Sequence, residues 1–107
     1  MTISTLEQLL QRVVGAQVWH RQAPEGEPVR IVWHQYGYTL VDGGNAPRLR
    51  LPQVQIDIYT QSEADTLAED VMDALSDADQ TYMVYDISYD DEEHAIRTVL
   101  QLELDHG

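Results

Sequence analysis

The 107-residue sequence contains no cysteine, no phenylalanine and no lysine, so all six of its cations are arginine. The absence of cysteine excludes disulfides, thiolate metal sites and cysteine nucleophiles. Because phenylalanine is missing, the ring volume must come from two tryptophans and six tyrosines. Their polar atoms need partners or water, which favours positions on sheet faces and at subunit contacts over a dry, deep core.

Long apolar runs are absent as well. No stretch approaches the ~20 apolar residues that cross a bilayer, and the N-terminal segment lacks the basic region that opens a signal peptide. A length of 107 residues fits one hydrophobic core. We therefore expect a soluble protein with a single domain over residues 1–107 and no membrane contact.

What the sequence has in excess is acid, because 19 acidic residues against six arginines give a net charge of −13. Thirteen of these acids, and no cation, fall within residues 51–96, whereas the flanks are close to neutral. This charge argues against general binding to nucleic acid, which requires basic side chains to neutralise phosphates. Two explanations fit the acidic, lysine-free composition equally: a halophilic host and a GC-rich genome.

Apolar periodicity predicts two helices and four strands. Leucine and valine at i, i+3, i+4 and i+7 spacing indicate a helix over residues 4–14, and an apolar stripe behind a cap at Ser62 indicates a second helix that reaches Leu75. β-Branched and aromatic residues indicate a strand at 29–40, and alternating apolar and polar residues indicate strands at 49–59 and 95–105. Residues 82–89 are predicted to be the strand that forms a hairpin with the last one. The predicted order is α-β-β-α-β-β, and the predicted fold class is α+β, an antiparallel four-stranded sheet with two helices packed on one face.

Patterns for catalysis or metal binding are weak. The four histidines form none of the usual zinc-site spacings, and no serine lies in a nucleophile-elbow motif. The acidic run at residues 90–93, followed by His94, contains possible metal ligands, but its spacing matches no calcium loop. An exposed hairpin tip is the simpler interpretation. The sequence therefore predicts no enzyme, no catalytic residue, no metal site and no cofactor.

Two arginines, Arg48 and Arg50, stand directly before the acidic block. One interpretation is a pair of outward-facing strand residues. The other is a contact between subunits, in which the arginine pair of one copy meets the acidic surface of a neighbour. A chain with a cationic part and an anionic part can associate head to tail, and such contacts can close into a ring.

The most specific pattern joins a strand to a helix. The strand at 49–59 ends in a polar turn and leads into a helix with a fixed spacing of small and apolar residues. An acidic loop further on precedes Arg97 and an alternating strand. The helix positions are Glu63, Ala64, Leu67, Ala68, Val71, Ala74 and Leu75. Over residues 52–104, this arrangement resembles the tail-completion or tail-terminator proteins of long-tailed bacteriophages, which are small ring-forming neck proteins.

The resemblance implies a structural virion protein without catalysis, located in the head–tail neck after assembly in the host cytoplasm. It implies a homo-oligomeric ring, expected to be a hexamer, that caps the finished tail tube and joins it to the head connector. The implied partners are further copies of the chain, the major tail-tube protein and the head connector or stopper protein. DNA would pass through the lumen of the ring without specific binding.

Charged residues supply the candidate contacts. Three arginines are candidates for contact with a neighbouring subunit or the tube: Arg48, Arg50 and Arg97. The candidate acidic face, toward the lumen or an interface, comprises Glu63, Glu69, Asp70, Asp73, Asp90, Asp91, Glu92 and Glu93. Two alternatives stay open. One is a head-completion or stopper ring of the same neck, and the other is an acidic interaction module that mimics nucleic acid.

Overall fold

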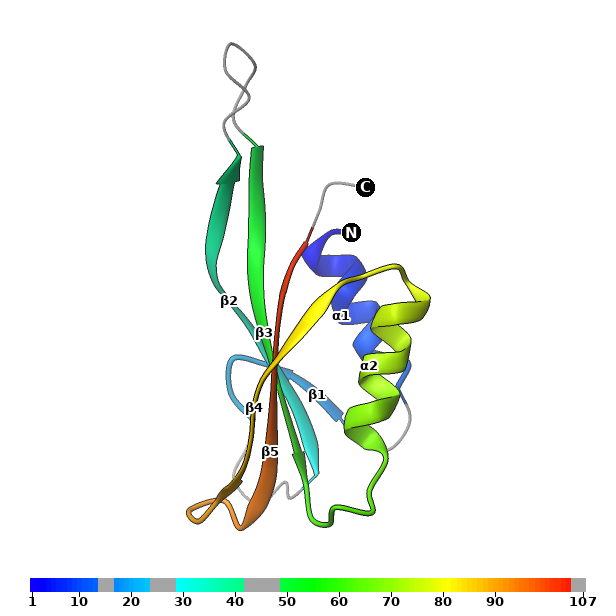
Figure 1. Ribbon diagram of the computed structural model, residues 1–107, viewed down its shortest axis with the longest axis vertical. Coiled ribbons are helices and arrows are strands. Elements are labelled where there is room, and N and C mark those ends of the chain that lie inside the picture. Colours follow the sequence, from blue (N-terminus) through cyan, green and yellow to red (C-terminus); the bar gives the residue numbers. More distant parts are fainter. Residues whose placement is uncertain (14–16, 24–28, 42–48, 105–107) are drawn as a thin grey trace.

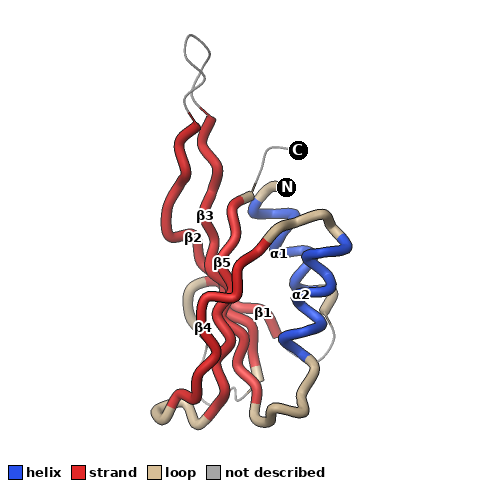
Figure 2. Tube along the Cα trace, viewed as in Figure 1, coloured by secondary structure: helices blue, strands red, loops and turns tan. Residues whose placement is uncertain are grey.

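The computed structural model describes residues 1–13, 17–23, 29–41 and 49–104 (Figure 1). The described residues form two layers, a five-stranded sheet and two helices that pack on one of its faces (Figure 2). The strand order across the sheet is β1-β2-β3-β5-β4. The elements are α1 (Ile3–Gln11), β1 (Gln17–His20), β2 (Arg30–Val41), β3 (Leu49–Thr60), α2 (Leu67–Asp77), β4 (Tyr82–Asp90) and β5 (Ala95–Glu103).

The prediction of a four-stranded antiparallel sheet is wrong, because the sheet has a fifth strand and is mixed. The additional strand, β1, pairs in parallel with β2, from Gln17 opposite Arg30 to His20 opposite Trp33. A strand of four residues is too short for alternation to be visible in the sequence. A parallel neighbour also usually requires a longer crossover than residues 21–29 supply. The other three pairings are antiparallel.

The second helix begins later than the sequence predicted. Ser62 does not cap it, because its hydroxyl accepts a hydrogen bond from the backbone of Ala64 in the turn before the helix. The backbone N–H of Leu67, the first helical residue, instead donates to Asp65 Oδ1 at 2.9 Å. Glu69 in the first turn suits the positive end of the helix dipole.

One face of the sheet, here called the helix-side face, carries the core. On β3, Ile56 and Ile58 are fully buried, and on β5 Leu100 pairs with Ile56 on the same face. The alternation predicted for these two strands is therefore confirmed. The helix residues buried against this face are Leu6, Leu10, Leu67, Val71 and Leu75.

The aromatic residues divide between the core and the surface. Trp33 is 3% exposed and stacks on His20 with ring centroids 4.1 Å apart, so the expectation that tryptophan avoids the core fails here. The tyrosines follow the expectation better. The strongly exposed ones are Tyr36, Tyr38, Tyr85 and Tyr89.

The helices are much shorter than the strands they cover. With nine and 11 residues, α1 and α2 are about 14 and 17 Å long, whereas the 12 residues of β2 and of β3 extend for about 40 Å. Consequently β2 and β3 continue past the helices as a two-stranded arm (Figure 1), whose described residues are 36–41 and 49–52. At the end of the sheet opposite the arm, β4 runs away from α2 toward the β4–β5 turn.

The packing of α2 on the sheet predicts the effect of a core truncation. We expect Leu75→Ala to lower the free energy of unfolding by about 2–5 kcal/mol, since a fully buried side chain is replaced by a cavity. Asp73→Ala, on the exposed face of the same helix, should change it by no more than about 0.5 kcal/mol. Urea denaturation of both variants checks this, and equal effects would contradict the assigned core face.

Candidate functional site

The arm exposes apolar side chains on the continuation of the helix-side face. A β-bulge shifts the register between Gln35 and Gly37, so that Tyr38 and Leu40, rather than the residues beside them, lie on that face. Tyr38 pairs with Pro52 and Leu40 with Arg50. The side chains of Tyr38 and Leu40 are 56% and 58% exposed. These four residues, Tyr38, Leu40, Arg50 and Pro52, are the arm surface.

A second bulge exposes apolar residues on β4 in the same way. Val84 lies on the helix-side face, and the register shift between Val84 and Asp86 places Ile87 and Tyr89 on that face as well. Ile87 is 62% and Tyr89 60% exposed, because β4 is an edge strand that leads away from α2. These three residues, Val84, Ile87 and Tyr89, are the β4 surface. Unbulged alternation would have placed Asp86 and Ser88 there instead.

On the open face, opposite the helices, a network of polar side chains crosses the sheet. Arg97 of β5 donates to Asp57 of β3 at 2.9 Å, and Gln55 donates to the other oxygen of the same carboxylate at 2.9 Å. Asp57 is 7% exposed. Burial by itself would lower the pKa of Arg97, but the charge and hydrogen bond of Asp57 outweigh it and raise that pKa. A buried charge is tolerated when it is paired in this way.

A second ion pair ties the β4–β5 turn to β2. Arg30 is 7% exposed, and its guanidinium lies 3.7 Å above the ring of Tyr59 and pairs with Glu93 at 3.0 Å. Burial raises the pKa of the Tyr59 phenol, and the positive charge of Arg97 only partly opposes this. Tyr59 is therefore neutral at physiological pH. Because each arginine has an acidic partner within the chain, this network stabilises the fold.

The structure separates the three candidate arginines. Arg97 lies in the open-face network, paired with Asp57, and Arg50 is exposed on the arm. Arg48 falls outside the described residues. Sequence reasoning placed all three together as contact residues, and only Arg50 among the described ones lies on the arm surface.

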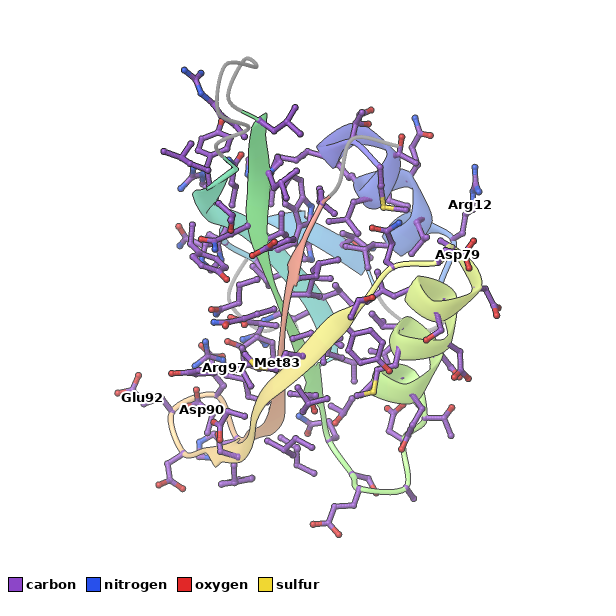
Figure 3. All side chains as sticks on the ribbon, turned by 45° about the horizontal axis from the view of Figure 1, so that its top comes forward. Arg12, Asp79, Met83, Asp90, Glu92 and Arg97 are labelled. Carbon is purple, nitrogen blue, oxygen red and sulfur yellow. The ribbon has the colours of Figure 1, made fainter. Side chains whose placement is uncertain are left out.

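The candidate acidic residues occupy two separate places. Glu63 lies in the turn before α2, and Glu69, Asp70 and Asp73 are exposed on that helix. At the other place, Asp90 ends β4, and Asp91, Glu92 and Glu93 form the turn that follows. Figure 3 shows Asp90 and Glu92 at this turn, well separated from Arg12 and Asp79 near the helix ends. The acids thus form no single continuous face.

The described surface includes a polar groove and an acidic one. One, of about 430 Å³, lies at the base of the arm between Gln53, Gln101 and Glu103, where Gln53 and Glu103 both bind the Thr39 hydroxyl. The other, of about 570 Å³, lies between the helices, and Arg12 shares it with three aspartates of α2. Neither groove is lined by a histidine or a serine. Among the described residues, no three histidine or acidic side chains gather as metal ligands would.

Comparison with known proteins identifies no relative: no protein-family model matches this chain, and no curated protein matches it either. Within the part of the chain that the structure describes, neither helix has the length and apolar character required to cross a membrane. The arm surface and the β4 surface are therefore the candidate contact sites. Sequence reasoning missed both surfaces, because a β-bulge in each strand exposes their apolar residues and the alternation along the sequence does not reveal it.

Two carboxylates that flank Val99 on the open face allow a matched test of the polar network there. Asp57 and Asp86 lie on either side of Val99 in the sheet register, but only Asp57 is buried. We expect Asp57→Asn to lower the free energy of unfolding by about 1–3 kcal/mol, since Arg97 loses its charged partner. Asp86→Asn changes net charge equally and should shift stability by about 0.5 kcal/mol at most. Thermal and urea unfolding at neutral pH give the comparison, and similar losses would show that burial is not the cause.

Proposed function

We propose that this chain is a structural subunit that assembles into a closed ring, and that the ring is the tail terminator of a long-tailed bacteriophage. One observation carries the proposal. The apolar helix-side face remains uncovered at both ends, on the arm surface and on the β4 surface. Exposed apolar patches on a small domain mark interaction sites.

The placement of the two surfaces favours a ring over a simple dimer. They lie at different ends of the long axis, which measures 50 Å against 26 and 21 Å for the other two (Figure 1). A subunit with two distinct contact surfaces associates head to tail, and such contacts either close into a ring or continue as a filament. The resemblance of residues 52–104 to tail terminators favours closure, with six copies as the expected number.

In this role the ring would cap the tail tube, end its polymerisation and present a surface to the head connector. The acids of α2 and of the β4–β5 turn stay on the outside of the fold. Any of them that face the lumen would repel DNA within a Debye length of about 8–10 Å. DNA could then pass without binding, as its transfer through a neck requires.

The net charge predicts how assembly responds to salt. Each copy carries a charge of −13, so neighbouring copies repel one another, while the apolar contacts between them are insensitive to screening. We expect the oligomer to become more stable as the salt concentration is raised. Native mass spectrometry and sedimentation measure its population, and negative-stain imaging shows whether it is a ring. A monomer at high protein concentration and high salt would favour the nucleic-acid mimic, and less oligomer at high salt would refute the electrostatic argument.

A single charge on the β4 surface should abolish assembly. Ile87 is 62% exposed, so Ile87→Asp should change the free energy of unfolding by about 0.5 kcal/mol at most while disrupting any apolar contact there. Gln8→Glu, on the exposed side of α1, adds the same charge elsewhere and serves as the control. We expect sedimentation to show monomers only for Ile87→Asp.

The same variants test the terminator role. Added to polymerising major tail-tube protein, the natural chain and Gln8→Glu should limit tube length, and Ile87→Asp should not. Equal tube lengths with and without the natural chain would contradict the terminator role even if rings form.

A further inference from the structure

Building on the proposed ring, we propose which surfaces meet in it: the arm surface of one copy packs against the β4 surface of the next. Both surfaces carry exposed aromatic and branched apolar side chains on a strand. Tyr38 and Leu40 stand on one, and Ile87 and Tyr89 on the other, each of them more than half exposed. Each surface therefore leaves apolar area in water that the other can cover.

The two surfaces cannot meet within one chain. Leu40 pairs with Arg50 on β3, whereas Ile87 lies opposite Thr98, which lies opposite Ile58 on the same strand. Arg50 and Ile58 are eight residues apart along β3, so the two surfaces are separated by about 27 Å along the strand. Any contact between the surfaces must therefore join two copies. The twist of the sheet turns its two ends toward different directions, as a contact repeated by rotation around a ring requires.

Charge favours the mixed contact over a contact of like surfaces. Residues 82–94, which include the β4 surface, contain five acids and no arginine, so two such segments facing each other would repel. Residues 36–53, which include the arm, contain two arginines and one acid. An arm against β4 therefore avoids the repulsion of two acidic segments. Arg50 lies on the arm surface itself, whereas Asp86 and Asp90 lie on the open face of β4, opposite the β4 surface.

The burial of exposed apolar surface also favours the mixed contact. A two-fold contact of arm with arm, or of β4 with β4, would bury one surface and leave the other exposed. The mixed contact buries both with a single repeated interface, and because it is heterologous it propagates from copy to copy. The second copy of this chain is therefore the partner that accounts for both exposed surfaces at once.

The absence of cysteine makes a cross-linking test clean, because each introduced thiol is the only one in its chain. Leu40→Cys and Ile87→Cys are both at exposed positions, so folding should be retained. The two variants are prepared separately, mixed under assembling conditions, and treated with a thiol-specific cross-linker much shorter than the separation within one chain. We expect a band of doubled mass in the mixture and little in either variant alone. Asp73→Cys mixed with Ile87→Cys is the matched control and should give no such band.

A double variant, Leu40→Cys with Ile87→Cys, reports how the contact propagates. We expect a ladder of cross-linked species that ends at the closed ring. Cross-linking within each single variant, with no gain in the mixture, would overturn the mixed contact while leaving a ring of another geometry possible. A ladder without an upper limit would support the contact but contradict the closed ring. A natural chain that stays monomeric at high salt, with no cross-linking in any mixture, would contradict both.

Discussion

The length mismatch between helices and strands is the constraint on which the other features depend. Two helices of about 14 and 17 Å cover only the middle of a sheet whose longest strands extend for about 40 Å. The buried core is complete where they lie, from Leu6 and Leu10 on α1 to Leu75 on α2. Beyond the helices, the same face continues without cover in both directions. The arm surface and the β4 surface are thus the two open ends of one apolar face.

On the open face, polar side chains stabilise the sheet of this strongly acidic chain. Its charges are paired across strands, Arg97 with Asp57 and Arg30 with Glu93. These pairs use residues far apart in the sequence and tie β2, β3, β5 and the β4–β5 turn together. Many of the other acids that the structure describes are exposed on α2 and at the turn, where water and salt screen them. Charge pairs across the strands, together with acids exposed on α2, are compatible with a net charge of −13 and an intact core.

The two bulges connect the fold to the proposed assembly. Each inserts one residue into a strand and exchanges the faces of every side chain after it. On β2 this carries Tyr38 and Leu40 to the helix-side face, and on β4 it carries Ile87 and Tyr89 there. The apolar face is thereby extended at both ends by residues that no helix covers, which is the geometry that a head-to-tail assembly uses.

By itself, the sequence determined what short-range periodicity controls. The alternation of β3 and β5 and the apolar stripes of both helices follow directly from the spacing of residues such as Ile56, Leu100 and Val71. Only the tertiary structure decided the rest. It added β1, too short to show a period, and it paired Arg97 with Asp57, a residue 40 positions away. It also placed Ile87 and Tyr89 on the uncovered face, because a single inserted residue reverses an alternation that reading along the chain must assume to be unbroken.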